Sequence, residues 1–157
     1  MTILKGNEGI IEFFDNVYHH AKKFGGELLS VCASEAPFVS EPFQSAAKIH
    51  LDRMIKIKHT IQAKCIITES DQSYCSEYSE YRKLSKHYVD SVPYYVYGDN
   101  CAFFMFNALP YPKVFVIKSE SLAKSFKLQF QSIWDKATPL NIVERSPNTV
   151  SNKTSRK

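Results

Sequence analysis

Apolar residues recur along this chain with two different spacings. From Asn7 to Phe24 they return every three or four positions, which predicts an amphipathic helix that Gly25-Gly26 ends. Residues 27–33 and 60–68 are short apolar runs, typical of buried strands. A second helix is predicted between these runs. Its apolar stripe consists of Phe43, Ala47, Leu51, Met54 and Ile55.

The second half of the chain contains a hairpin pattern. Two apolar runs flank Gly98-Asp99-Asn100, and this arrangement predicts a β-hairpin. A strand at 113–118 follows, and then a helix for which Ser119 is the expected N-cap. The apolar residues of that helix share about a third of its circumference, and only Leu128 points the other way. Pro139 is expected to stop the helix.

Residues 73–87 are predicted to form a further helix. Its expected core residues are Tyr74, Tyr78, Tyr81 and Leu84. Strands that alternate with helices and end in a hairpin predict an α/β fold with a mixed sheet flanked by helices. We expect one domain over residues 1–137 and a basic, disordered tail over residues 138–157.

The charge of the chain is concentrated near its end. The net charge is +4 over 157 residues. Four basic residues face one acid, Glu144, after residue 137, so the tail accounts for +3 and the body for +1. The basic residues are Arg145, Lys153, Arg156 and Lys157. A short basic tail is more often a solvated end than a DNA-binding arm, so we do not expect direct nucleic-acid binding. No apolar run approaches the ~20 residues of a membrane span, and the first residues lack a signal-peptide pattern. We therefore expect a cytoplasmic protein with no membrane association.

Cysteine and histidine residues show no metal-ligand spacing. The four cysteines lack a C-x-x-C pair, and Cys32, Cys65 and Cys101 fall in apolar runs where a buried, reduced thiol is expected. Four histidines are expected at the surface or at helix ends. They are His19, His50, His59 and His87. The sequence predicts no cofactor and no metal.

Four segments together resemble a known family. They read L-K-G-N-E-G-I at 4–10, K-I-K-H-T-I-Q-A-K-C-I-I at 56–67, Y-V-Y-G-D-N-C-A at 95–102, and V-F-V-I-K-S-E-S-L-A-K-S-F-K-L-Q-F-Q-S-I-W at 114–134. The pattern resembles a single phospholipase D-like half domain, and more specifically the C-terminal effector domain of TrmB-type sugar-sensing transcriptional regulators. The resemblance implies the phospholipase D-like fold for residues 1–137.

The phospholipase D motif H-x-K-x4-D is altered at two of its three positions. The family places the aspartate in a turn between two strands, and Asp99 occupies the matching turn. The nucleophilic histidine then corresponds to Val92 and the phosphate-binding lysine to Tyr94. A valine cannot attack phosphorus, and a tyrosine carries no positive charge at neutral pH. We therefore expect no catalytic residues, and take Tyr94 and Asp99 as candidate ligand-binding residues.

One other segment fits the motif by spacing alone, His20-x-Lys22-x4-Glu27. It ends a predicted helix, so we expect its side chains to face solvent and the match to be coincidental. The tyrosines and phenylalanines of the hairpin could line a ligand cleft or simply fill both faces of a covered sheet.

Two functions remain open at this point. The first is a non-catalytic ligand-sensing or interaction domain, linked to transcription regulation through a partner. TrmB-type regulators carry a winged helix-turn-helix before the effector domain, and only about 26 residues precede the first predicted strand here, too few for that module. The expected partner is a second copy of the chain or a DNA-binding protein, and a small-molecule ligand is possible. The alternative is a dimeric phospholipase D-class phosphodiesterase or nuclease.

Overall fold

A computed structural model describes residues 1–31, 34–73, 75–89 and 92–140. One eight-stranded sheet has the order β1-β7-β6-β5-β2-β3-β4-β8. The strands are β1 (Thr2–Lys5), β2 (Gly26–Val31), β3 (Ile61–Thr68), β4 (Ser79–Leu84), β5 (Tyr94–Tyr97), β6 (Asn100–Met105), β7 (Lys113–Lys118) and β8 (Thr138–Pro139). Strands β2, β3 and β4 are parallel, and the other neighbours pair antiparallel. The mixed α/β sheet predicted from the sequence is confirmed.

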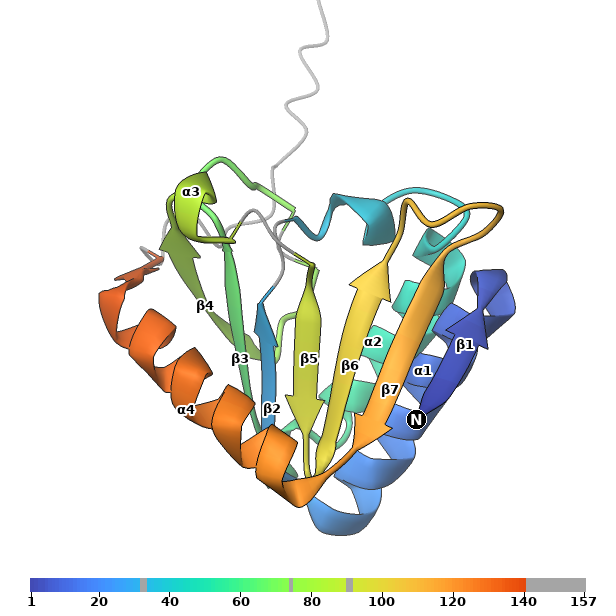
Figure 1. Ribbon diagram of the computed structural model, residues 1–157, viewed down its shortest axis with the longest axis horizontal. Helices are drawn as coiled ribbons and strands as arrows, with labels where there is room; N and C mark the ends of the chain where they lie inside the picture. The colour runs from blue at the N-terminus through green and yellow to red at the C-terminus, as the bar shows by residue number, and fades with distance from the viewer. Residues whose placement is uncertain (32–33, 74, 90–91, 141–157) are drawn as a thin grey trace, which may run out of the picture.

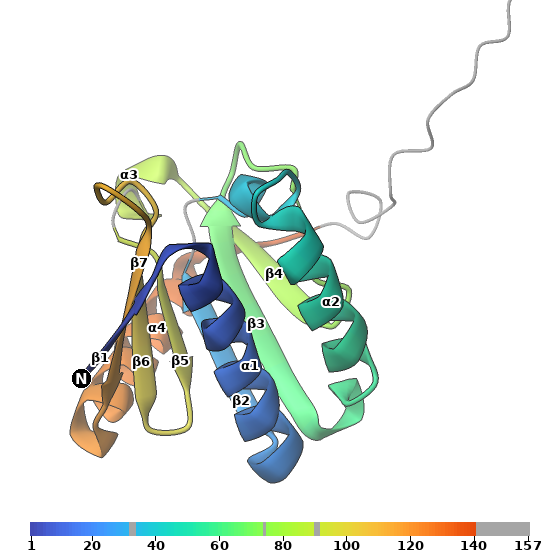
Figure 2. The same ribbon diagram turned by 90° about the vertical axis from the view of Figure 1, so that its right-hand side faces the viewer.

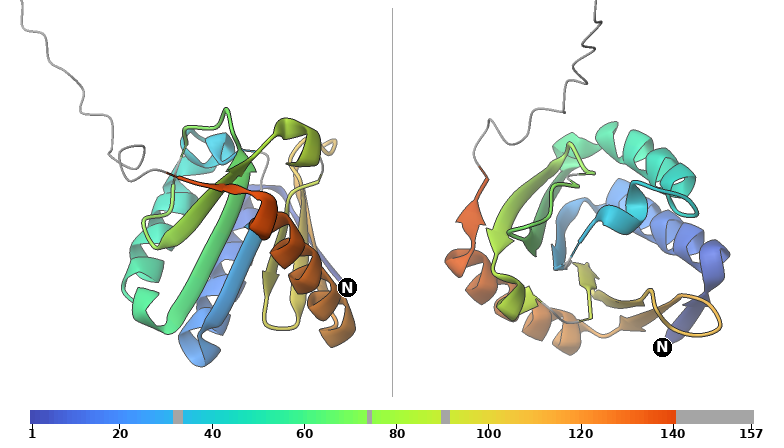
Figure 3. Two further views of the ribbon diagram at one scale, coloured as in Figure 1. Left: turned by 90° about the vertical axis from the view of Figure 1, so that its left-hand side faces the viewer. Right: turned by 90° about the horizontal axis from the view of Figure 1, so that it is seen from above.

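Helices cover both faces of this sheet. Helices α1 (Gly6–Phe24) and α2 (Gln44–Ile55) lie on one face, and α4 (Glu120–Lys136) crosses the other face diagonally (Figures 1 and 2). The short helix α3 (Lys86–Val89) and the 3₁₀ turns η1 (Ala36–Phe38) and η2 (Lys58–Thr60) lie in connections. Seen from above, the sheet is strongly curved, with α1 and α2 inside the curve and α4 outside it (Figure 3).

The α4 helix follows its predicted pattern. The hydroxyl of Ser119 accepts a hydrogen bond from the backbone N–H of Leu122 at 3.3 Å, which confirms the N-cap. Phe130 and Trp134 are 1% and 3% exposed in the core between α4 and the sheet. Leu128 is 66% exposed, as the helical spacing predicts.

The helix predicted over residues 73–87 is wrong. Residues 69–73 and 75–78 instead belong to the crossover between the parallel strands β3 and β4, and β4 then runs from Ser79 to Leu84. Tyr74, one of the expected core residues, lies outside the described residues. Within β4, Ser79 and Tyr81 are buried while Glu80 between them is exposed, which is the two-residue period of a strand. Every residue of β4 pairs with a residue of β3, from Ala63 to Thr68, and this pairing provides the backbone hydrogen bonds. The i, i+3 spacing of the tyrosines therefore does not decide the structure.

The end of the described chain extends the sheet. Thr138 and Pro139, which we expected to begin the tail, form β8 and pair antiparallel with Lys83 and Arg82 of β4. Residues 141–157 of the expected tail lie outside the described residues. Within the described part of the chain, no helix combines the length and the hydrophobicity that a membrane span requires.

Candidate functional site

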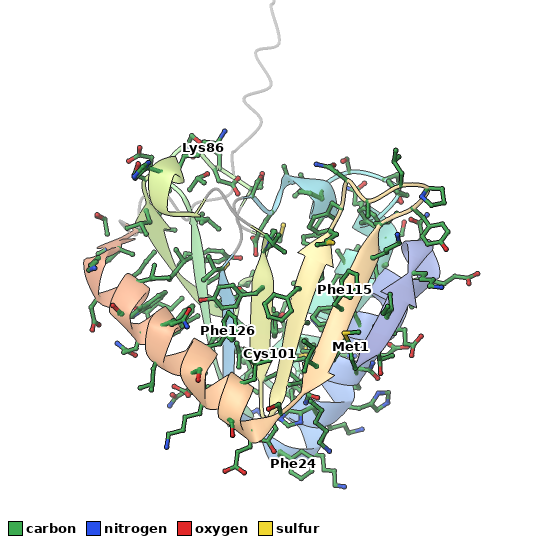
Figure 4. The ribbon with its side chains drawn as sticks, viewed as in Figure 1. Met1, Phe24, Lys86, Cys101, Phe115 and Phe126 are labelled. Carbon is green, nitrogen blue, oxygen red and sulfur yellow. The ribbon has the colours of Figure 1, made fainter. Side chains whose placement is uncertain are left out.

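Tyr94 lies in the core between β5 and α4. Its side chain is 9% exposed, and its ring packs edge-on against Phe126 with centroids 5.0 Å apart. Figure 4 shows Phe126 reaching from α4 towards the sheet. The Tyr94 hydroxyl is buried without a hydrogen-bond partner among the described residues. Burial raises the pKa of Tyr94 to about 12, so its phenol is neutral and cannot replace a phosphate-binding lysine.

Asp99 lies at the opposite end of β5 from Tyr94. It is exposed in the hairpin turn, and its carbonyl oxygen accepts a 2.8 Å hydrogen bond from the N–H of Ser119. Gly98 before it has a φ of 54°, and a Cβ there would clash with the His20 ring. Asp99 therefore fixes the start of α4, and the structure does not bring it together with Tyr94 in one site.

The remaining motif positions also lack catalytic geometry. Val92 is 42% exposed and offers no nucleophile. In the segment His20-x-Lys22-x4-Glu27, Lys22 and Glu27 are exposed as expected. His20 is instead partly buried, and its ring packs against that of Tyr97 with centroids 5.5 Å apart. Burial lowers the pKa of His20. These residues form no nucleophile–base pair.

A cavity of about 80 Å³ opens on the other side of the sheet, between helices α1 and α2 and the strands. Its walls are mainly apolar and come from both helices, η1, the crossover before β4 and the sheet. The aromatic lining residues are Phe13, Phe14, Phe38, Tyr78, Tyr95, Phe104 and Phe106. The Phe13 ring meets Phe104 edge-on, with centroids 4.8 Å apart. The hairpin aromatics thus divide between the two faces: Tyr94 and Phe103 face α4, and Tyr95, Phe104 and Phe106 face this cavity.

One end of the cavity holds a hydrogen-bonded group that we call the Glu35 cluster: Glu35, Asp71, Cys75, Ser76 and Tyr81. Oε2 of Glu35 accepts hydrogen bonds from the Tyr81 hydroxyl and from the Cys75 backbone N–H, both at 2.8 Å. The N–H of Glu35 donates to Oδ2 of Asp71 at 2.8 Å, and the N–H of Ser76 donates to the Tyr81 hydroxyl at 2.8 Å. The cluster ties the loop after β2 to the crossover between β3 and β4.

Burial controls ionisation in this cluster. It raises the pKa of Glu35, and the hydrogen bonds from Cys75 and Tyr81 oppose that shift only in part. The pKa of Tyr81 lies well above its ordinary value because of burial and the neighbouring Glu35 charge. The Tyr81 hydroxyl therefore stays protonated and acts as a donor. No ion pair involves Glu35 or Asp71 among the described residues.

His50 lines the same cavity from α2, so its predicted surface position is wrong. Its side chain is 6% exposed and stacks on Phe14 with ring centroids 4.5 Å apart. Its Nδ1 is buried with no hydrogen-bond partner among the described residues. Burial, and next the positive charge of Arg53, lower the pKa of His50 to about 3, so the imidazole is neutral. His19, His59 and His87 are exposed, as predicted.

Little in the sequence indicates this cavity. The segment Asp71-Gln72-Ser73 does carry the signature of an Asx turn, and the Ser73 N–H donates to Oδ1 of Asp71 at 2.8 Å. Glu35 has no such local signal, because the partners of its carboxyl and of its N–H lie 30 to 46 residues away. Cys65 and Cys101 are buried, as predicted, while Cys32 lies outside the described residues.

Comparison of the fold with solved structures agrees with the resemblance seen in the sequence. The archaeal chromatin protein TrmBL2 superposes with a TM-score of 0.54 and 16% identity, over 88% of this chain and 54% of that one. Nuc from Salmonella typhimurium, a phospholipase D family member, superposes with a TM-score of 0.57 and 12% identity, over 89% of this chain and 98% of that one. NucT from Helicobacter pylori superposes with a TM-score of 0.58 and 9% identity, over 88% of this chain and 98% of that one. The sequence matches no known family model and no curated protein.

These similarities establish a phospholipase D-like fold over most of the chain. At identities below a quarter, they concern the fold alone. The chain spans about half the length of TrmBL2 and nearly the whole length of Nuc and NucT.

Proposed function

We propose that this chain is a non-catalytic domain that senses a small ligand or joins a partner protein, in the manner of the effector domains of TrmB-type regulators. One observation carries the proposal: the motif positions for nucleophile and phosphate-binding lysine hold Val92 and Tyr94. Tyr94 is neutral and buried under Phe126. Neither residue supplies the charge or the nucleophile that phosphodiester cleavage needs.

The second candidate is a phospholipase D-class phosphodiesterase or nuclease acting as a dimer. The similar fold of Nuc, a phospholipase D family member, supports it. A hydrolysis assay on bis(p-nitrophenyl) phosphate without added metal separates the two candidates. We expect no turnover above buffer.

The assay includes three variants, His20→Ala, His87→Ala and, as a control, His59→Ala. His59 is exposed and lies outside the segment His20-x-Lys22-x4-Glu27. Turnover that persists through purification and disappears in His20→Ala or His87→Ala, but not in His59→Ala, would reject a non-catalytic role.

An open sheet face supports association with a partner. Directly opposed residues of neighbouring strands share a face, so the pairs Ile3–Phe115, Phe115–Phe103 and Phe103–Tyr94 form one apolar row across β1, β7, β6 and β5. Helix α4 covers the Tyr94 end and leaves the β7–β1 end open (Figures 1 and 4). Ile3 is 40% exposed there. We propose that this end contacts a second copy of the chain or a DNA-binding partner protein.

The partner, and not this chain, is proposed to contact DNA. TrmBL2 is described as binding DNA, but this chain covers only 54% of its length. The total net charge is +4 and the last twenty residues carry +3, so residues 1–137 carry only +1. The linkage to transcription regulation therefore passes through the complex.

Light scattering at several concentrations tests the association. We expect a mass above that of one chain, and Ile3→Lys should return it to one chain. Ile49→Lys, at a 65% exposed position on α2, is the matched control and should leave the mass unchanged. A single-chain mass throughout, with no partner recovered from lysate, would reject the proposed association.

A further inference from the structure

The cavity between α1, α2 and the sheet combines aromatic walls with acidic groups that lack a basic partner. Glu35 lines it, and Asp71 is hydrogen-bonded to the Glu35 backbone at 2.8 Å. Neither carboxyl forms an ion pair within the described residues. Lys64 also lines the cavity, but its ammonium lies 5.4 Å from the centre of the Trp134 ring, which packs on the opposite face of the sheet. Within the described ranges, no basic side chain therefore pairs with these two carboxyls.

A second, independent feature also indicates a ligand at this cavity. Nδ1 of His50 is buried in the cavity wall without a partner, although the residue is only 6% exposed. Buried polar atoms in folded proteins almost always have a hydrogen-bond partner, so each exception asks for an explanation. A ligand group that bonds to this nitrogen provides one.

The size and chemistry of the cavity restrict the ligand. A dry cavity of about 150 Å³ accommodates benzene, so about 80 Å³ suits a shorter, unbranched molecule. A hexose is larger than benzene and therefore exceeds this volume, and a phosphate needs cationic contacts, for which the described lining offers only Lys64. Aromatic faces and a carboxylate together attract an organic cation. Among the described residues, no three His, Cys, Asp or Glu side chains are grouped to hold a metal ion.

We propose that this cavity binds a small organic amine whose ammonium group pairs with Glu35 and whose second polar group bonds to Nδ1 of His50. The inference rests on the proposed ligand-sensing role and names the ligand class for it. The ammonium group supplies a positive charge beside the two carboxyls. The short carbon chain lies against the aromatic walls, which include Phe13 and Phe104.

Three probes of the same chain length test the charge requirement. They are ethanolamine, ethylene glycol and glycolate, which are positive, neutral and negative at pH 7. Binding is followed by NMR titration of the full chain at millimolar probe concentrations. The amine should bind about tenfold more tightly than the diol, the ratio expected for one charge-assisted hydrogen bond, and the acid should not bind. Equal binding of all three, or no binding of the amine, overturns the proposal.

The position of the bound amine is tested first in the unmodified protein. The amine should shift the methyl signals of Leu28 and Ala63, which line the cavity. It should leave those of Ala123 and Ala137 unchanged, because they lie on α4 and directly after it. Shifts confined to Ala123 and Ala137 would overturn the assignment even if every variant failed to fold.

Glu35→Gln then removes the charge, while its amide oxygen still accepts from Tyr81 and Cys75 as Oε2 does. It should weaken amine binding about tenfold and leave the diol unchanged. Glu80→Gln removes an equal charge at an exposed position of β4 and is the matched control. His50→Phe should also weaken the amine. Full amine affinity in Glu35→Gln overturns the proposal, whereas the separate phosphodiester assay alone decides whether the domain is catalytic.

Discussion

Tyr81 and Glu35 are 46 residues apart in the sequence, yet the Tyr81 hydroxyl donates a 2.8 Å hydrogen bond to the Glu35 carboxylate. The same hydroxyl accepts from the Ser76 N–H at 2.8 Å. One phenol on β4 thereby joins the loop after β2 to the crossover between β3 and β4. The geometry of the cavity end depends on this bridge.

Tyr81→Phe should lower the free energy of unfolding by about 1–3 kcal/mol, because the buried Ser76 N–H and the Glu35 oxygen each lose a partner. Urea denaturation followed by circular dichroism measures the change. An unchanged free energy of unfolding would mean that water replaces the lost hydroxyl in both hydrogen bonds.

Tyr94→Phe should have the opposite outcome. The Tyr94 hydroxyl is buried without a partner among the described residues, while its ring packs against Phe126 at 5.0 Å. Deleting only the hydroxyl keeps the ring contact and removes an unsatisfied polar atom. We expect the free energy of unfolding to stay the same or rise by up to about 1 kcal/mol. The same urea experiment decides, and a loss as large as that of Tyr81→Phe would show that the hydroxyl has a partner.

The elements that could be predicted from the sequence have local signals. The hairpin depends on the turn at Gly98, and α4 on the Ser119 cap and on apolar residues at helical spacing; both are found where expected. The row of apolar residues across β5, β6 and β7 also follows from simple alternation. These patterns were sufficient for the α/β fold because each is contained within one element.

Features that depend on distant partners could not be predicted in the same way. Strand β4 contains charged residues and tyrosines at positions that fit a helix, and only its pairing with β3 makes it a strand. β1, at the edge of the sheet, is four residues long and was not predicted. His50 gave no sign of burial, because its neighbour Phe14 is on another helix. The cavity is built from these contacts, so the sequence placed the candidate site at Tyr94 and Asp99 instead.

Stability should depend on His50 in mildly acidic solution. Burial, and next Arg53, lower the pKa of His50 to about 3 in the folded protein, against an ordinary value of 6.5. Below pH 6.5 the unfolded chain binds a proton that the folded protein does not, so the free energy of unfolding falls as the pH drops towards 3. Between pH 7 and pH 5 the loss due to His50 is about 2 kcal/mol.

His50→Phe, which can keep the stack on Phe14, isolates this effect. The wild type should lose about 2 kcal/mol more than the variant between pH 7 and pH 5, as measured by urea denaturation at each pH. The raised pKa of Glu35 acts in the opposite direction, since its folded form takes up a proton first on acidification. That contribution is common to both proteins and cancels in the comparison. Parallel pH profiles would show that His50 titrates normally.

The last described residues stabilise the edge of the sheet at β4. Strand β8 pairs with Arg82 and Lys83, and Leu140 after it packs against the buried cluster of Cys65, Ile67 and Tyr81. A chain ending at Ala137 loses both contacts and exposes the edge of β4, whereas a chain ending at Leu140 keeps them.

We expect the shorter chain to lose about 1–2 kcal/mol, the value of partly burying a leucine, and its melting temperature to fall by several degrees. The chain ending at Leu140 should have the same melting temperature as the full chain, because the residues that follow Leu140 are mostly polar or charged. Calorimetry on the three chains compares both boundaries at once. Equal melting of the two truncated chains would mean that β8 and Leu140 add nothing to the body. A lower melting temperature for the chain ending at Leu140 than for the full chain would mean that residues 141–157 stabilise it.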